Sequence, residues 1–204
     1  ALPNDATPGI YLGGFISDQV YLSGGITGLN SDPTDPWKGV ERVFDEGEFF
    51  KFVELGWTSS KDRFYFDNVH LTFWHVDDIE ETATPDGWGV NFSASFWVDD
   101  CYMPFLRAGY ADDGGSLLEG SVSAGVAWRP REDDLLGVAV NWGRPNESSF
   151  GSGLDDQYGL EAFYRAQVTD NLRLTPSLQL LGDPALNPDE DLIAVFGMRG
   201  VLSF

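Results

Sequence analysis

The sequence predicts an all-β protein, a transmembrane antiparallel β-barrel of the outer-membrane type, from three observations. Residues 191–204 form one strand of alternating character that ends on an aromatic residue, Phe204. Similar strands of roughly 8–13 residues recur along the chain, near the length that a tilted membrane-spanning strand needs. The connections between them alternate between short turns and longer polar segments, which is the asymmetry of an outer-membrane barrel.

Composition agrees with this class and excludes others. The chain has 204 residues with 24 glycines and 15 phenylalanines, and 42% of it is hydrophobic. No run approaches the ~18 consecutive apolar residues of a spanning helix, which excludes a helical membrane protein. The net charge of -21 excludes phosphate-directed binding of nucleic acid. Solvated surface loops explain this acidity; divalent-cation bridging at a lipopolysaccharide surface or a cation-favouring vestibule are the functional alternatives.

About eleven strands follow from the period-two pattern and the turn residues between them. The first two meet at a tight turn around Asp18-Gln19, and later short turns include Asp99-Asp100 and 169–171. Long polar connections are expected at 30–47, 77–87, 144–156 and 182–190. The strands are expected at 10–17, 20–29, 49–58, 64–76, 88–98, 102–110, 117–128, 135–143, 158–168, 172–181 and 191–204.

The direction of these strands predicts an incomplete wall. If the short turns are periplasmic and the long acidic loops extracellular, residue 204 ends on the periplasmic side and the first strand starts outside. A complete bacterial barrel has an even strand number with both ends periplasmic. We therefore expect residues 1–204 to be a single β-barrel domain, the C-terminal portion of a larger barrel whose N-terminal strands are missing, or one completed by another polypeptide.

Each strand separates an oily face from a polar one, and aromatic residues lie at strand ends. A soluble β-sandwich would show the same alternation with its oily face inward. Aromatic rings at both ends of the strands favour a barrel, because amphipathic rings belong at membrane interfaces. The rings in question are Trp57, Trp88, Tyr102, Tyr110, Trp128 and Tyr158.

The polar register supplies the candidate functional residues, which are expected to line the lumen. Charged groups survive there because the lumen is wet and partners such as Glu161 are expected nearby. Two interpretations stand for the arginines: cross-strand ion pairs that stiffen the wall, or a lining whose guanidinium and amide groups hydrogen-bond sugar hydroxyls. The candidates are Glu54, Asn68, His70, Arg107, Glu161, Arg165, Gln167, Arg173, Gln179 and Arg199.

Signals for other chemistry are poor, so no enzymatic activity and no cofactor are expected. The two histidines, His70 and His75, lie in opposite registers and suggest no metal pair. Acidic pairs such as Asp77-Asp78, Glu80-Glu81 and Asp155-Asp156 are interpreted first as solvated charge and second as Ca²⁺ ligands. Asp67 falls in the lipid-facing register of the expected strand 64–76, so it should lie close to the periplasmic rim.

Several segments resemble the carbohydrate-selective porin (OprB) family. They are residues 47–57, 62–76 and 161–179, then Asn187-Pro188 and the terminal strand. The resemblance implies a sixteen-stranded outer-membrane porin that passes sugars by passive, substrate-preferring diffusion, five strands being absent at the N-terminal side. The matched inner-register positions that carry over as lining candidates are Glu54, Asn68, His70, Glu161, Arg165 and Gln179.

Two other functions remain as alternatives: a non-specific, weakly charge-selective general porin, and an envelope-structural protein. In every case the expected location is the bacterial outer membrane. The expected partners are outer-membrane lipid, lipopolysaccharide and small sugars, without nucleic acid, and the expected assembly is a monomer or a homotrimer.

Overall fold

The computed structural model describes residues 7–29, 35–45, 47–80 and 82–204 and confirms the all-β class. One antiparallel sheet of eleven strands contains every strand beside its neighbours in sequence, in the order β1 to β11. The strands are β1 (Gly9–Phe15), β2 (Val20–Gly28), β3 (Phe49–Thr58), β4 (Asn68–Val76), β5 (Gly87–Ser95), β6 (Tyr102–Asp113), β7 (Leu118–Trp128), β8 (Leu135–Pro145), β9 (Gln157–Gln167), β10 (Leu172–Gly182) and β11 (Leu192–Leu202).

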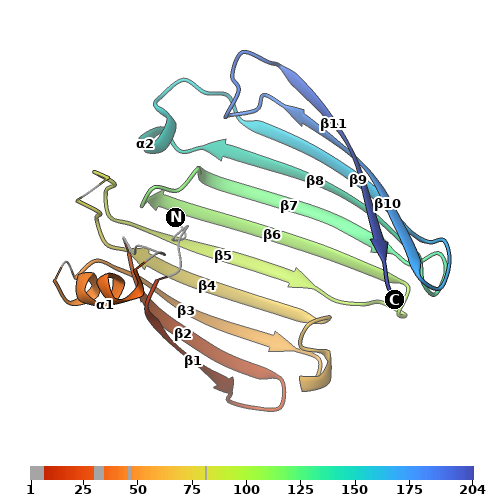
Figure 1. Ribbon diagram of the computed structural model, residues 1–204, viewed down its shortest axis with the longest axis horizontal. Helices are drawn as coiled ribbons and strands as arrows, with labels where there is room; N and C mark the ends of the chain where they lie inside the picture. Colours follow the sequence, from red (N-terminus) through yellow and green to blue (C-terminus); the bar gives the residue numbers. More distant parts are fainter. Residues whose placement is uncertain (1–6, 30–34, 46, 81) are drawn as a thin grey trace.

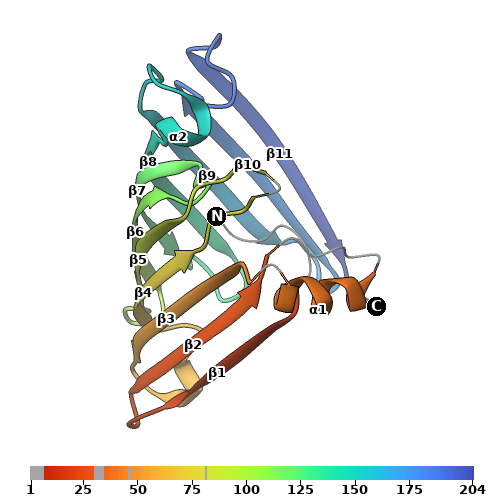
Figure 2. The same cartoon turned by 90° about the vertical axis from the view of Figure 1, so that its left-hand side faces the viewer.

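The sheet bends into a trough (Figures 1 and 2). The ends of its strands form two opposite edges, which differ from the edge strands β1 and β11. One edge, here the short-connection edge, carries residues 16–19, 59–67, 96–101, 129–134 and 168–171 together with the C-terminus. The opposite, long-connection edge carries the two helices, α1 (Pro36–Asp45) and α2 (Glu147–Phe150). The expected alternation holds in part: the 114–117 turn on the long-connection edge is short, and the 59–67 connection on the short-connection edge is as long as 183–191 on the other. Helix α1 lies on the side toward which the sheet bends (Figure 2).

The two faces of the sheet show an inverted relation between polarity and exposure. Large apolar side chains of one register are open, with Leu12 76% and Val140 55% exposed. The other register carries the polar side chains yet is more sheltered, as Ser23 at 6% exposure illustrates. We call these the outer and inner faces. A soluble sandwich would bury its oily face, whereas a membrane barrel turns it toward lipid.

Aromatic rings mark both ends of the outer face. Trp57, Tyr102 and Trp128 lie near the short-connection edge, and the rings of Tyr102 and Trp128 stack with centroids 6.4 Å apart. Trp88 and Tyr110 lie near the other edge, with centroids 5.6 Å apart. Tyr158, paired with Trp142, continues this second band. The predicted positions of the aromatic rings at strand ends are thus confirmed.

Helix α1 is a feature that the sequence analysis placed in a loop. Asp35 precedes it and accepts a hydrogen bond from the Lys38 N–H at 3.4 Å, and Pro36 occupies the first helical position. Both are ordinary helix-start signals. No helix in the part of the chain that the structure describes is long and apolar enough to cross a membrane.

Strand β4 begins later than expected. Residues 64–67 do not extend the strand, because Lys61–Arg63 forms a 3₁₀ turn and Phe64 continues in the helical region at φ -47° and ψ -37°. The ring of Phe64 packs edge-on against Tyr21 at 5.0 Å. Asp67 therefore precedes the strand at the short-connection edge, and it is not a residue of the lipid-facing register.

Candidate pore-lining face

The strand register places all ten candidate residues on the inner face. Directly paired residues share a face of a sheet, so a chain of pairs connects distant strands. His70 pairs with Ser93, Ser93 with Arg107, and Arg107 with Ser123. On the last strands, Glu161 pairs with Gln179, Arg173 with Gln167, and Arg199 with Thr175. The remaining candidates are Glu54, Asn68 and Arg165, which belong to the same register.

Three of these candidates, Glu54, Asn68 and His70, form one hydrogen-bonded network with Thr72 and Tyr21. The Tyr21 hydroxyl lies 3.0 Å from Glu54 Oε1 and 3.2 Å from Asn68 Oδ1. Asn68 Oδ1 also lies 2.6 Å from His70 Nδ1, and the Thr72 hydroxyl donates to Glu54 Oε2 at 2.8 Å. Because every member is held by its neighbours, the network fixes the orientation of the Glu54 carboxylate on the wall.

A glycine makes room for this network. Gly56 lies beside Tyr21 in the register, and a Cβ added at Gly56 would lie 2.0 Å from Cζ of the Tyr21 ring. Any larger residue would displace the ring whose hydroxyl lies within hydrogen-bond distance of Glu54 and Asn68. Gly159 serves Asn141 in the same way, since its Cβ would lie 2.2 Å from the Asn141 amide nitrogen. Tyr21 and Asn141 thus lie flat on the inner wall.

A shallow hollow of about 350 Å³ lies beside the network on β4 to β7. Polar side chains dominate its lining: His70, Asn91, Ser93, Arg107, Ser121 and Ser123. Hydroxyl, amide, imidazole and guanidinium groups together offer both hydrogen-bond donors and acceptors. Such a lining suits an uncharged polyhydroxylated solute better than an apolar one.

The three serines of this hollow were not predicted from the sequence, although the signal was present. Ser93, Ser121 and Ser123 alternate with apolar residues on their strands. Only the register, which pairs Asn91 with Thr72 and Gly109, shows that they adjoin the Glu54 network.

The ion pairs of the first of the two interpretations of the inner arginines are not found among the described residues. Among the described residues, no ion pair involves Arg107, Arg165, Arg173 or Arg199. Glu161 was the expected partner, but it stands four residues from Arg165 on the same strand, a separation of roughly 13 Å. The expectation failed because a shared face was taken for proximity.

Asp77 and Asp156, two acids that were interpreted as solvated charge, form contacts that connect strands at the long-connection edge. Asp77 Oδ1 lies 2.7 Å from Lys51 Nζ and 3.4 Å from His75 Nδ1, and Asp77 Oδ2 accepts the Phe49 N–H at 3.0 Å. Asp156 accepts the Trp142 indole N–H at 2.9 Å. Within the described ranges, no three His, Cys, Asp or Glu side chains are placed to hold a metal ion. Glu81 of the proposed Ca²⁺ pairs lies outside those ranges.

Asp67 organises the short-connection edge. Its carboxylate accepts hydrogen bonds from Arg63 Nε and the Ser59 hydroxyl, each at 2.6 Å, and from the Trp97 N–H at 2.9 Å. The Arg63 guanidinium is the main cause that lowers the pKa of Asp67 to about 2, and Ser59 and Trp97 add to the effect against the opposing influence of burial. Asp67 thereby joins the β3–β4 turn to the end of β5.

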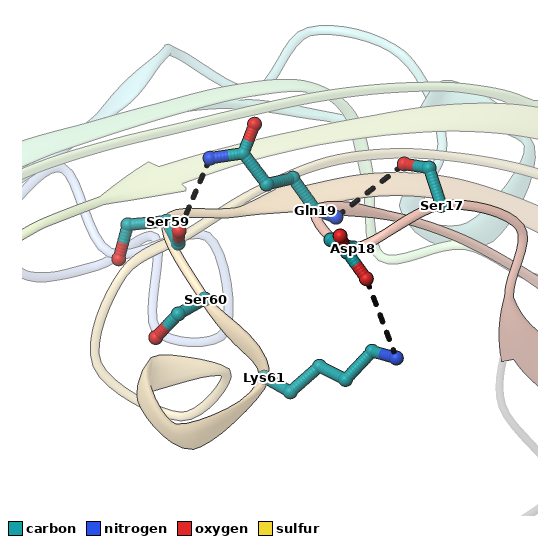
Figure 3. Close-up of a pocket in the computed structure, with 6 residues that line it drawn as sticks. All are labelled: Ser17, Asp18, Gln19, Ser59, Ser60 and Lys61. Carbon is teal, nitrogen blue, oxygen red and sulfur yellow. Dashed lines mark hydrogen bonds and ion pairs between the residues drawn. The ribbon is translucent and has the colours of Figure 1, made fainter.

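A second hollow, of about 620 Å³, lies at the same edge between the first two hairpins (Figure 3). The Gln19 side chain donates to the Ser59 carbonyl at 3.1 Å, and Lys61 Nζ lies 3.9 Å from Asp18 Oδ1. These contacts join two turns across open solvent, and Asp18 is fully exposed. The hollow is a gap between braced turns that lies outside the inner face.

Comparison with known proteins assigns the family. The family model described as carbohydrate-selective porin, OprB family, matches residues 65–204. The chain belongs to the OprB family. A solved structure, the high-pH structure of Pseudomonas putida OprB, superposes with a TM-score of 0.69 at 14% sequence identity. The superposition covers 96% of this chain and 58% of that one, and no curated protein matches the sequence.

These findings support the OprB porin fold and a place in the bacterial outer membrane. The family is one of channels, which agrees with the expectation that the chain is not an enzyme. The chain spans 58% of the length of the P. putida porin. The apolar outer face of this OprB-family chain, with its two aromatic bands, agrees with this fold.

Proposed function

We propose that the protein is a passive diffusion channel for small carbohydrates whose wall includes the inner face of this sheet. The polarity of that face supports the proposal most strongly, because sheltered hydrogen-bonding side chains occupy one face of the sheet and exposed apolar side chains occupy the other. Water can fill such a lumen, and sugar hydroxyls can exchange hydrogen bonds with its lining. Glu54, His70, Asn91 and Arg107 are the lining residues that we propose contact the solute.

We further propose that these eleven strands are part of a larger closed barrel. Among the residues that the structure describes, β1 pairs with β2 alone and β11 with β10 alone. Each edge strand would otherwise present unpaired N–H and C=O groups to hydrocarbon, at a cost of several kcal/mol per group. Additional strands that pair with β1 on one side and with β11 on the other would close the barrel and remove that cost. The short-connection edge would face the periplasm, as in other barrels with short periplasmic turns.

Single-channel recording in planar bilayers with titrated glucose tests the function. The proposal predicts an open channel whose ion current falls in a dose-dependent manner as glucose enters. Glu54→Gln keeps the size of the side chain and removes the charge, and it should weaken the block. Ser17→Ala, in the β1–β2 turn outside the inner face, is the matched control and should leave the block unchanged.

The result identifies the alternatives as well. Conductance that no sugar affects would contradict sugar preference and indicate a general porin. A complete lack of conductance by the full-length protein would contradict the channel itself and favour a structural role in the envelope.

A further inference from the structure

We propose that four arginines near the short-connection edge of the inner face form a binding site for small oxyanions, solutes that carry a carboxylate or a phosphate group. The residues, here the arginine band, are Arg129, Arg165, Arg173 and Arg199. The inference rests on the proposed function in one respect, that this face lines a water-filled lumen. It adds a second class of solute to the neutral sugars proposed above.

The register brings the four side chains to one level of the wall. Arg199 on β11 pairs with Thr175 on β10. Arg173, two residues before Thr175, is diagonal to Arg199, and diagonal neighbours on one face of a sheet are ~7–8 Å apart. Arg165 lies on β9, two strands from Arg199, a distance of roughly 10 Å at the ordinary strand spacing.

Arg129 extends the band to the end of β7. Trp128 pairs with Leu136, and Leu135 pairs with Arg165. Arg129, the residue after Trp128, therefore lies level with Leu135 and Arg165. Arg165, two residues before Gln167, is also diagonal to Arg173, because Arg173 pairs with Gln167, and diagonal neighbours on one face are ~7–8 Å apart.

No carboxylate of the described chain neutralises the band. The ion pairs of the described residues include none of its four members. The two buried carboxylates of the same edge are already occupied. Asp67 is held by Arg63 and Ser59. Asp134 accepts the Tyr164 hydroxyl at 2.7 Å and the Gln167 N–H at 2.9 Å.

The donors are held in place and remain partly unused. The Arg129 guanidinium lies 4.4 Å from the centroid of the Trp97 ring, and one of its N–H groups donates to the Asp100 carbonyl at 3.3 Å. Arg173 donates through Nε to the Gln167 side chain at 3.2 Å. Arg165 Nε is buried and has no hydrogen-bond partner among the described residues. A guanidinium has five N–H donors, so most of those in the band are available.

Repulsion and an unsatisfied donor are both unfavourable, and an oxyanion would relieve both. Carboxylate and phosphate groups accept bidentate hydrogen bonds from guanidinium forks, an arrangement that lysine cannot reproduce. A cluster of positive charge in a protein of net charge -21 is therefore best explained by a negatively charged solute. Sugar acids and sugar phosphates combine this group with the hydroxyls that the rest of the wall can bind.

Titration calorimetry of the full-length protein in detergent tests binding without requiring conduction. The probes are inorganic phosphate and gluconate, with glucose as the neutral reference. We expect both anions to bind, and the double variant Arg165→Gln/Arg173→Gln to weaken their affinity at least tenfold. Arg165→Lys keeps the charge and loses the fork, so it should give an intermediate loss. Arg131→Gln is the control, because Arg131 is 81% exposed in the adjacent turn.

Reversal potentials across a salt gradient supply the second readout. Each arginine lost should lower the chloride-to-potassium permeability ratio about fourfold, because the Coulomb effect of one charge roughly 6 Å from a passing ion at ~0.1 M salt is about twofold for each ion and has opposite sign for chloride and potassium. Wild-type binding of both anions by the double variant, or no anion binding by the wild type, would overturn the inference. Absence of conductance with anion binding retained would contradict the channel function alone.

Discussion

Replacing Asp67 with asparagine should destabilise the protein at neutral pH and have almost no effect in strong acid. The Asp67 side chain is 8% exposed and accepts hydrogen bonds from Arg63, Ser59 and the Trp97 N–H. These contacts lower its pKa from 3.8 to about 2. Because the pKa is lower in the folded state, the contribution is complete well above pH 3.8 and is lost as the pH falls toward 2.

The size of the effect follows from the same shift. One pKa unit corresponds to ~1.4 kcal/mol, so a change from 3.8 to about 2 gives a contribution of roughly 2 kcal/mol at neutral pH. This is an upper value, because the Arg63 side chain is 38% exposed and salt screens the pair. Asparagine keeps the shape but replaces one of two acceptor oxygens that are both in use, so the loss reports the charge together with that acceptor.

Urea unfolding in lipid vesicles, followed by tryptophan fluorescence, measures this loss. The difference between wild type and Asp67→Asn should reach about 1–2 kcal/mol at pH 7 and fall toward zero near pH 2. Asp62→Asn is the control, since Asp62 lies exposed in the same turn and forms no ion pair in the described chain. An equal loss for Asp67→Asn at both pH values would refute the reasoning, because a packing defect does not titrate.

Two further predictions concern packing and the two faces. Gly56→Val should lower the free energy of unfolding by about 1–3 kcal/mol, since its Cβ would lie 2.0 Å from the Tyr21 ring. The control Gly14→Ala, whose Cβ meets open space, should cost far less. Equal losses for the two variants would contradict the close-contact argument. Val140→Arg on the outer face should lower the free energy of unfolding in lipid vesicles by about 2–4 kcal/mol. Ser123→Arg on the inner face should lower conductance and preserve stability. The opposite pattern would show that the two faces are wrongly assigned.

Strands and their faces were predictable from sequence because a period of two is a local property. Strand β3 was expected at its observed bounds, and the other strands differ mainly at their ends. Helix α1 was missed even though Asp35 and Pro36 form a helix start, since the segment was judged by its charge. The start of β4 was misplaced because Phe64, Tyr65 and Phe66 are an apolar run that resembles a strand.

Contacts between strands were less predictable, because they depend on register. The sequence places Glu54, Asn68 and His70 on one face, but only the pairing of β2 with β3 brings Tyr21 to them. It likewise places Arg165 and Glu161 on one face without revealing their separation along the strand. The connection of Asp67 to Trp97, across two turns, has no signal in either local segment.

Cysteine accessibility along β4 tests most directly the claim that the polar face lines water and the apolar face meets lipid. In a Cys101→Ser background, single cysteines at residues 68 to 73 would be treated with a charged, membrane-impermeant thiol reagent in reconstituted vesicles. The account predicts rapid labelling at Asn68, His70 and Thr72 and protection at Val69, Leu71 and Phe73. Labelling in the opposite alternation, or equal labelling at all six positions, would contradict it.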